Sequence, residues 1–534
     1  MSEHLPPVIV GAGPAGIRAA ERLVAAGLCP VVVDEAARWG GQIYRQPPEI
    51  LSGGGFTRPK TALYGFEAAK ADAVHRAMAA IRDRVDYRLR TLVWNCEDGA
   101  LDLLCDGASE TLPFSHLILA TGATDRVLPF PGWTLPGVFT LGGSQVALKF
   151  QGCAVGRRVA FLGTGPLLYL VAYQYLKAGV EVAGVFDTTP FAVQARATAG
   201  MLRDPATLAK GLLYVGWLRA HGVPIHNGVR PVRAEGTERV DALVWRDARG
   251  QERRTACDAI AFGLGLRSET QLADLAGCRF RFDEADRAWL PERDGAGRSS
   301  VPGVYLAGDG SGIAGADAAE LAGERAALAL LEDLGRPVDS KRVKELDGRL
   351  ARIAAFRRSL SAAFPFPADW ADAIADDTMI CRCEGVTAGA VREIARSGQA
   401  REMNRAKALT RAGMGRCQGR MCGATTAELL SRTLGTGPDG VGRLRAQPPI
   451  KPLPIATIIP SPPRSRANEV CADATGGPLV RRERGEGQGK GDASRGSDRP
   501  TAPLQPATSA PPRIPLTQPS PRGGEGSDDG REVA

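Results

Sequence analysis

The sequence predicts an α/β protein with two doubly wound parallel-sheet domains, followed by a small helical domain and a disordered tail. Three observations indicate this class. An apolar run, a glycine-rich turn, a helix-like segment and a second apolar run occur in that order at residues 8–34 and again at 158–187. Four of the eleven cysteines form two close pairs between residues 381 and 422. From about residue 456 onward, Pro, Gly, Ser and Arg replace the large apolar residues that a core requires.

Length and charge exclude several classes of protein. A chain of 534 residues exceeds one ordinary domain and can bury sizeable cores. The formal net charge of +8 comes from scattered Lys and Arg, without the basic stripe interleaved with aromatic residues that nucleic-acid binding requires. The opening MSEHLPP lacks a basic segment followed by an apolar core, and no run approaches the ~18 apolar residues of a membrane span. We therefore predict a cytoplasmic protein with no nucleic-acid partner and no membrane span.

The first repeat, residues 8–34, predicts a dinucleotide site of the Rossmann type. Its three glycines follow the G-x-G-x-x-G spacing, in which the first permits a tight turn, the second lets backbone approach a pyrophosphate and the third lets the helix pack on the strand. The helix that follows offers free N–H groups and a positive dipole end to the phosphates. Asp34 comes 23 residues after the first glycine and can accept from a ribose hydroxyl. The predicted contacts are Gly11, Gly13, Pro14, Ala15, Gly16 and Asp34. A βα turn that binds nothing is the alternative.

The segment after this unit predicts a passage beside a flat ring system. Glu35 begins the stretch, and the Gly-Gly pair before Gln42 lets backbone run close to a ring. Glu35, Gly41 and Gln42 are therefore candidate cofactor contacts, against the alternative of a plain surface turn. Residues 46–62 are loop-like and could cover the ligand. A helix over 68–84 and strands near 87–94 and 101–104 then predict a small antiparallel excursion.

Two later strands return the chain to the same site. The first ends in Ala-Thr-Gly, so Thr121 and Gly122 are expected at the dinucleotide. The second ends in Gly-Asp-Gly, where Gly308 and Asp309 precede a helix over about 316–331. An Asp at this position can accept from ribityl or ribose hydroxyls, and the helix N-terminus favours the electron-rich edge of a reduced flavin. Because a nicotinamide site does not need this third segment, the sequence predicts FAD in the first unit.

The second repeat, residues 158–187, is altered at two positions. Leu168 stands where the third glycine belongs, so the helix and strand cannot pack as closely. Phe186 occupies the sequence position equivalent to Asp34, and Asp187 follows one residue later, where a strand residue points to the opposite face. We expect this domain to keep the fold and to have lost or altered its ligand. Binding of NAD(P) here stays open.

The four paired cysteines predict a metal centre. Cys381 and Cys383 form C-x-C, and after 33 residues Cys417 and Cys422 form C-x4-C. Four thiolates on two glycine-rich turns suit either an iron–sulfur cluster or a structural zinc. Thr387 is expected to cap a helix that runs to about residue 396, and a second helix is expected from about residue 425.

Positive charges near these turns are expected to offset the negative charge of the thiolates. They are Arg382, Lys407, Arg416 and Arg420. The other seven cysteines stand alone, and in the cytosol we expect them to be thiols rather than disulfides. They are Cys29, Cys96, Cys105, Cys153, Cys257, Cys278 and Cys471.

The motifs of the first 335 residues resemble those of a known flavoprotein family. GAGPAG, WGGQIY, LATG, LGTGPLLYL and YLAGDGSG occur in the order found in relatives of thioredoxin and glutathione reductases. The resemblance covers residues 8–335 and implies an FAD domain that is interrupted by the second dinucleotide-type domain. Those reductases carry a redox C-x-x-C or C-x4-C within these two domains, whereas no such spacing occurs here before residue 381. This departure argues against disulfide reduction.

The cysteine motif resembles the domain typified by bacterioferritin-associated ferredoxin, which implies that Cys381, Cys383, Cys417 and Cys422 hold a [2Fe–2S] cluster. Together with the flavoprotein body, KALTRAGMGRCQGRMCG resembles the A-type subunit of opine oxidases, the B-type subunit of hydrogen cyanide synthases and hydroxyproline or proline dehydrogenase subunits over about residues 5–455. The resemblance implies an electron-transfer subunit with FAD and [2Fe–2S]. It also implies an FAD-dependent, amine-oxidising partner subunit, with a small third subunit left open.

The expected function is therefore oxidation of a C–N bond in an opine, proline, hydroxyproline or glycine type of substrate, with electrons passed to an acceptor other than oxygen. One alternative is a stand-alone NAD(P)H-dependent reductase that feeds the cluster, and another is a zinc-stapled, non-catalytic assembly subunit. No residue is nominated as a catalytic base. The predicted parts are an FAD domain (1–150 and 263–335), a second dinucleotide-type domain (151–262), a linker (336–375), a [2Fe–2S] domain (376–435) and a tail (436–534).

Overall fold

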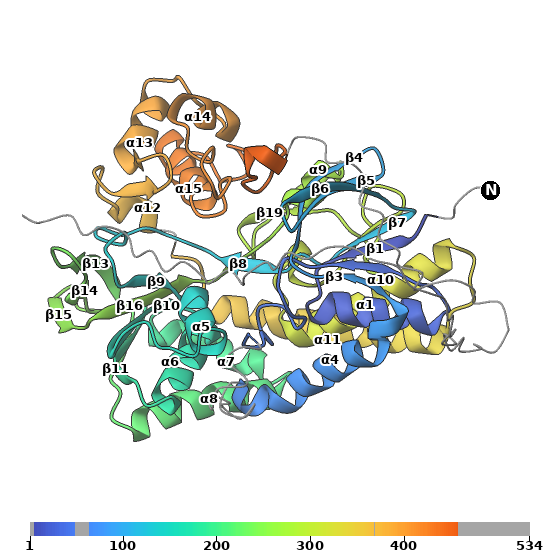
Figure 1. Cartoon of the computed structure of the whole chain (residues 1–534). Coiled ribbons are helices and arrows are strands. Elements are labelled where there is room, and N and C mark those ends of the chain that lie inside the picture. The colour runs from blue at the N-terminus through green and yellow to red at the C-terminus, as the bar shows by residue number, and fades with distance from the viewer. Residues whose placement is uncertain (1–4, 49–63, 368, 458–534) are drawn as a thin grey trace, which may run out of the picture. The chain divides into compact units, whose positions relative to one another are not determined.

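A five-stranded parallel sheet forms the centre of the first domain. The computed structural model describes residues 5–48, 64–367 and 369–457 (Figure 1). The sheet has the order β20–β7–β1–β2–β3. These strands are β1 (Pro7–Val10), β2 (Val31–Val33), β3 (Asp86–Arg88), β7 (His116–Leu119) and β20 (Val304–Leu306). The last strand comes from beyond the second domain, so the first domain is discontinuous in sequence, as the motifs predict.

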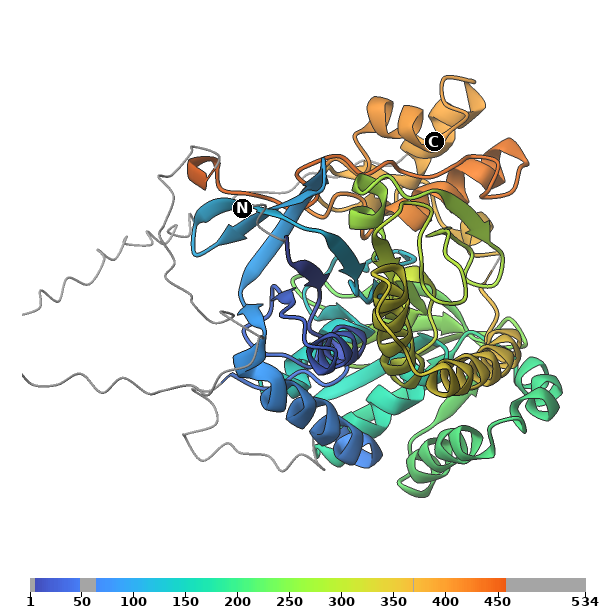
Figure 2. The same ribbon diagram turned by 90° about the vertical axis from the view of Figure 1, so that its right-hand side faces the viewer.

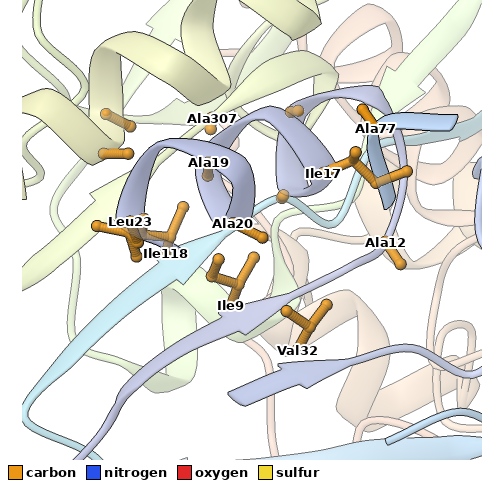
Figure 3. Close-up of a cluster of buried hydrophobic side chains, with 14 of the residues drawn as sticks. Ile9, Ala12, Ile17, Ala19, Ala20, Leu23, Val32, Ala77, Ile118 and Ala307 are labelled. Carbon is orange, nitrogen blue, oxygen red and sulfur yellow. The ribbon is translucent and has the colours of Figure 1, made fainter. Parts of the chain in front are cut away.

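Helix α1 (Pro14–Ala25) packs one apolar face on this sheet. Ile17 and Leu23 are fully buried against Ile9 and Ile118 (Figure 3). Burial of side chains of this size stabilises the fold by about 1.5–3 kcal/mol each. On its other side α1 contacts α10 (Ala316–Asp333), where a Cβ on Gly323 would lie only 1.9 Å from the carbonyl oxygen of Ala15. The glycine therefore permits the two helices to touch backbone to backbone.

The first domain also contains the predicted antiparallel excursion. Helix α4 (Ala68–Ile81) continues as the 3-10 turn η2 (Arg82–Arg84), so the predicted helix over 68–84 is confirmed. The excursion is the sheet β4–β5–β6, made of β4 (Thr91–Glu97), β5 (Ala100–Cys105) and β6 (Ala108–Pro113). Most of the predicted cover loop, residues 49–62, lies outside the described residues.

The second domain has its own five-stranded parallel sheet in the order β12–β11–β10–β16–β9. Its strands are β9 (Val138–Thr140), β10 (Arg158–Thr164), β11 (Glu181–Asp187), β12 (Ile225–Asn227) and β16 (Ala259–Leu264). A small antiparallel sheet follows, made of β13 (Arg230–Glu235), β14 (Ala242–Arg246) and β15 (Glu252–Ala256). The helices are α5 (Leu141–Lys149), α6 (Pro166–Lys177), α7 (Phe191–Met201) and α8 (Pro205–Ala220).

The register of this second sheet corrects one sequence expectation. The pairing of β10 with β11 shifts by one residue at an irregularity between Val159 and Ala160, so that Gly163 pairs with Asp187. In the first sheet Val10 pairs with Val33, which puts Gly11 level with Asp34. Asp187, and not Phe186, is therefore the structural counterpart of Asp34. An extra residue in a strand reverses the faces of those after it, which counting along the sequence cannot reveal.

A long helix and a small helical domain follow. Helix α11 (Ser340–Ala363) lies within the predicted linker and packs on α10, as the yellow ribbons of Figure 2 show, and on α7. The small domain contains α12 (Trp370–Ala373), α13 (Ala388–Arg396), α14 (Met403–Thr410), α15 (Gly423–Leu434) and the hairpin β21 (Met379–Cys381) with β22 (Val386–Thr387). The other strands and α-helix of the described residues are β8 (Ala123–Asp125), β17 (Leu266–Ser268), α9 (Gln271–Leu275), β18 (Phe280–Asp283) and β19 (Ala288–Pro291), and the 3-10 turns are η1 (Gly65–Glu67), η3 (Gly308–Ser311) and η4 (Ile455–Thr457).

Residues 436–457 are packed rather than disordered, contrary to the predicted start of the tail at 436. Ile450 is buried in the first domain, and its N–H donates to the carbonyl oxygen of Trp94 at 3.1 Å. Arg443 pairs with Asp274 at 2.6 Å. These contacts join residues far apart in the sequence, so residues 436–457 belong to the folded part of the chain, in keeping with the change of composition at about residue 456. Residues 458–534 lie outside the described part of the chain.

One isolated cysteine also departs from expectation. Cys29 is disulfide-bonded. Cys96, Cys105, Cys153, Cys257 and Cys278 are thiols, as expected. Cys471 lies outside the described residues.

Candidate flavin and iron–sulfur sites

The glycines of the first unit form a cradle at the end of β1. A Cβ on Gly16 would lie 1.8 Å from the carbonyl oxygen of Gly11, and a Cβ on Gly11 would lie 2.3 Å from that of Ala120. Pro14 opens α1, and no side chain caps its first turn at Gly13. The N–H groups of that turn are thus left for a ligand, which is the arrangement a pyrophosphate requires. This cradle fits the dinucleotide part of FAD.

Asp34 lies beside this cradle at the end of β2. Its carboxylate accepts from the backbone N–H of Ala12 at 2.5 Å and of Ala36 at 2.7 Å. Burial raises the pKa of Asp34, and these two N–H groups act in the opposite direction. A carboxylate has about four acceptor positions, so capacity for a ribose hydroxyl remains.

Of the three residues predicted to pass beside a ring system, only one lies at the glycine cradle. Gly41 has φ +65°, and a Cβ on it would lie 2.9 Å from the Cα of Gly13, so this turn lies directly against the cradle. Gln42 is exposed and accepts from Arg45 at 2.6 Å. Glu35 is exposed and forms an ion pair with Lys451 from the C-terminal extension. The structure therefore brings Gly41, rather than the two side chains, to the cradle.

The other two predicted segments also meet here. A Cβ on Gly308 would lie 3.0 Å from the Cβ of Ala15, so the Gly-Asp-Gly turn lies against the start of α1. The carboxylate of Asp309 accepts from the N–H of Ala314 and Gly315 at 2.8 and 2.9 Å, which organises the turn before α10. The Thr121 hydroxyl donates to the carbonyl oxygen of Glu269 at 2.6 Å. Gly122 has φ +70° and turns the chain away from the sheet.

In the second unit the acidic residue at the end of the second strand is closed, meaning that it is buried and hydrogen-bonded by protein groups. Asp187 is fully buried, and its carboxylate accepts from the Tyr169 hydroxyl, the Gln194 amide and the Thr189 N–H at 2.7 to 2.8 Å. Burial raises the pKa of Asp187 to about 6. Leu168, at the third-glycine position, is also fully buried. Three protein donors thus occupy the acid that a ribose would need.

The four paired cysteines come together around one cavity. It is lined by Cys381, Cys383, Cys417 and Cys422. A Cβ on Gly415 would lie 2.2 Å from the Cβ of Cys383, so this glycine lets the two cysteine turns approach. Among the described residues, no three His, Cys, Asp or Glu side chains converge to hold a single metal ion. A [2Fe–2S] cluster divides four thiolates between two irons, so its ligands need not meet at one point.

Backbone donors surround the sulfur atoms. A hydrogen bond from Cys422 lowers the pKa of Cys381 to about 6, and backbone N–H groups of Gly413 and Glu384 act in the same direction against burial. The same neighbour lowers the pKa of Cys417. Helix α15 begins directly after Cys422, so its positive end faces the thiols. This donor set fits an anionic tetrathiolate cluster.

The helices and charges expected around the cluster are present in part. The Thr387 hydroxyl accepts from the N–H of Ala390 and caps α13, as predicted. Arg382 and Arg416 line the cysteine cavity. Lys407 instead donates to the Gln447 side chain at 3.2 Å. Arg420 forms an ion pair with Glu269 of the first domain.

Two known protein families match this chain, one in each of the regions that hold the candidate sites. Residues 6–323 match the model of the pyridine nucleotide-disulphide oxidoreductases. Residues 379–432 match a BFD-like [2Fe-2S] binding domain. The chain belongs to the pyridine nucleotide-disulphide oxidoreductase family. It is a flavoprotein oxidoreductase, and the predicted cofactors FAD and [2Fe–2S] are confirmed.

Relatives support this membership over most of the chain. The A-type subunit of opine oxidase from Rhizobium meliloti is 35% identical, over 88% of this chain and 89% of its own length. Hydrogen cyanide synthase subunit HcnB of Pseudomonas aeruginosa is 35% identical, over 85% of this chain and 98% of its own length. The predicted resemblance to these subunits is thereby confirmed. The chain is an FAD- and iron–sulfur-containing oxidoreductase subunit.

The fold is shared with a solved structure, L-proline dehydrogenase from P. horikoshii. The two share 20% sequence identity with a TM-score of 0.63, over 85% of this chain and 79% of the other. Within the described ranges, no helix is both long and apolar enough to cross a membrane.

The sequence interpretation missed three side chains that connect the two sites. Arg267, Glu269 and Gln271 each reach the loop that carries Cys417 and Cys422. The signal available covered only Arg267 and Glu269, which stand two residues apart after the apolar strand that ends at residue 264, since such residues of an extended segment share a face. Gln271 begins α9, and no sequence pattern marks it.

Proposed function

We propose that this chain is the electron-transfer subunit of a complex that oxidises a C–N bond of an amino-acid-derived substrate. The substrate class is an opine, proline, hydroxyproline or glycine. An FAD-dependent partner subunit removes the electrons from the substrate, and this chain passes them to an acceptor other than oxygen. The single observation that supports it most is the joining of a flavin cradle and a four-cysteine centre in one chain.

The two cofactors supply complementary chemistry when bound, because a flavin accepts electrons in pairs and an iron–sulfur cluster exchanges them one at a time. The chain's own residues hold the two centres. The cradle of Gly11, Gly13 and Gly16 receives the dinucleotide, and backbone N–H groups of the cysteine turns stabilise the anionic cluster. The names of these relatives support the opine type of substrate and the expectation of a partner, since both are subunits.

A direct test is co-purification of the full chain with the products of the neighbouring genes. The complex is then assayed anaerobically with opines, proline, hydroxyproline and glycine, using an artificial dye as electron acceptor. We expect dye reduction with one of these substrates, and its loss when this chain is omitted. Substrate oxidation that proceeds equally fast without this chain would contradict the assignment.

A stand-alone NAD(P)H-dependent reductase remains the second candidate, because Asp187 lies level with Gly163 as a nucleotide-binding acid would. The closure of Asp187 by Tyr169 and Gln194 argues against it. Anaerobic addition of NADH or NADPH to the flavin-loaded chain separates the two functions. Stoichiometric bleaching of the flavin would favour the reductase, and we expect no bleaching.

A further inference from the structure

One short segment lies between the flavin-binding turns and the cysteine loop. Strand β17 pairs with β8, which places Ser268 opposite Ala123, directly after Thr121 and Gly122. The N–H of Glu269 donates to the carbonyl oxygen of Gly122 at 2.9 Å. The Ser268 hydroxyl accepts from the N–H of Gly312 at 3.1 Å, beyond the Gly-Asp-Gly turn. Residues 268–269 therefore contact two of the segments that form the flavin site.

The alternate side chains of the same segment point the other way. The Arg267 guanidinium donates to the carbonyl oxygen of Arg420 at 2.8 Å, and the Gln271 amide donates to that of Gln418 at 2.7 Å. Both acceptors lie between the ligands Cys417 and Cys422. Arg267 points to the opposite face of β17 from Ser268, because successive side chains of a strand alternate. Gln271 reaches the same loop from the first residue of α9.

The centre of this contact is a bidentate ion pair. The Arg420 guanidinium donates to both oxygens of Glu269, at 2.7 and 3.2 Å, and each side chain is only 13% exposed. Burial would raise the pKa of Glu269, but the positive charges of Arg420 and Arg267 outweigh it and lower that pKa. The carboxylate is therefore charged at neutral pH. Charges in such a weakly solvated place act strongly on their neighbours.

We propose that Glu269 and Arg420 are positioning residues that couple the flavin and the cluster electrostatically. The inference rests on the proposed function, because it presumes electron exchange between the two centres. The carboxylate, held on the flavin-site backbone through Gly122, lowers the tendency of the cluster to accept an electron. The guanidinium, two residues before Cys422, raises it. The pair thereby sets the driving force for single-electron transfer between the sites.

The test is an anaerobic redox titration of the full chain loaded with FAD and cluster, without substrate or partner. The cluster is followed by electron paramagnetic resonance and the flavin by its absorbance. In Glu269→Gln, the unopposed positive charge of Arg420 should favour the reduced cluster about tenfold, a rise of about 59 mV in midpoint potential for one electron. In Arg420→Gln, the midpoint should fall by a similar amount.

A matched control exists in the same interface. Arg287 and Glu428 form another bidentate pair between the two domains, at 2.6 and 2.9 Å, with Glu428 six residues after Cys422 on α15. Glu428→Gln should change the equilibrium constant for reduction of the cluster less than threefold. Shifts of equal sign in Glu269→Gln and Arg420→Gln, or shifts no larger than that of Glu428→Gln, would overturn the coupling.

A further variant covers the case in which Arg420→Gln does not retain its cluster. Glu269→Asp keeps the negative charge, so its midpoint should lie near that of the wild type, whereas Glu269→Gln should not. Identical midpoints in these two variants would overturn the proposal. A wild-type chain without flavin or cluster signals would overturn the proposed function as well, whereas the absence of an oxidised amino-acid substrate would leave these potentials unaffected.

Discussion

The two βαβ units of this chain share one backbone arrangement. They differ in the solvent exposure of the acidic residue at the end of the second strand. In the first unit, Asp34 is partly exposed and accepts from backbone N–H groups beside the glycine cradle. In the second, Asp187 is fully buried and accepts from the side chains of Tyr169 and Gln194. The same acid in the same register is open in one unit and closed in the other.

The difference starts at one position of the helix. Gly16 lets α1 lie so close to β1 that a Cβ would lie 1.8 Å from the Gly11 carbonyl oxygen. Leu168 fills the equivalent position with a buried side chain, and the following residue, Tyr169, reaches Asp187. A Rossmann-like fold therefore tolerates loss of the third glycine, and in this chain that loss accompanies a closed acid at the end of the second strand. Four substitutions test this conclusion.

The largest effect is expected when the first unit receives the residue of the second. In Gly16→Leu, α1 must move away from β1 because of the clash with the Gly11 carbonyl. Overpacking of this severity costs about 4 kcal/mol, which lowers the affinity for FAD close to a thousandfold. The flavin content of the purified chain measures this loss, and an intact cluster signal shows that the cysteine domain is folded. Gly211→Leu, at a helix position with open space around it, is the control and should retain its flavin.

The second effect concerns the pH dependence of stability. Burial raises the pKa of Asp187 to about 6, so the folded state binds this proton more tightly than the unfolded state does. Its stabilisation is fully present below about pH 4 and is lost as the pH rises through 6, a change of about 3 kcal/mol. Urea unfolding of wild type and Asp187→Asn at pH 4 and 7 should show this difference in their free energies of unfolding. If the two proteins differed in free energy of unfolding by the same amount at both pH values, the raised pKa of Asp187 would be contradicted.

The third effect separates the two acids in ligand binding. The Ala12 N–H donates to one carboxylate oxygen of Asp34 and the Ala36 N–H to the other. Asp34→Asn replaces one of these oxygens by an amide NH2 and removes the negative charge that a ribose hydroxyl would donate to. A lost charged hydrogen bond costs about 2 kcal/mol, so FAD should bind about thirtyfold more weakly. Asp187→Asn is the matched control and should bind FAD as the wild type does. Titration of FAD into the apoprotein measures both, and equal losses in the two variants would break the comparison.

The smallest effect comes from opening the second unit. Tyr169→Phe removes one donor to Asp187 and should cost about 1 kcal/mol of stability. A thermal scan should then show a melting temperature lower by about 2–4 °C. Flavin content should not change, because Tyr169 belongs to the second domain. A loss of flavin in this variant would show that the two units are not independent.

Much of the fold followed from local patterns. The two βαβ units, the return strand that ends before Gly308 and the cap at Thr387 depend on periodicity and on residue types a few positions apart. The two groups of cluster cysteines could also be recognised in the sequence, because the two cysteines of each group stand only a few residues apart. The three glycines predicted the cradle, and a Cβ on Gly11 or Gly16 would clash with backbone of the same sheet or the same unit.

Contacts between residues distant in the sequence were decided only by the tertiary structure. The one-residue irregularity in the second sheet changed which residue matches Asp34, and no local pattern marks it. The ion pair of Glu269 and Arg420 joins residues 151 positions apart, and the packing of residues 436–457 depends on partners in the first domain. Periodicity reports which face of an element is apolar, whereas the partner of a buried charge is fixed only when the chain has folded.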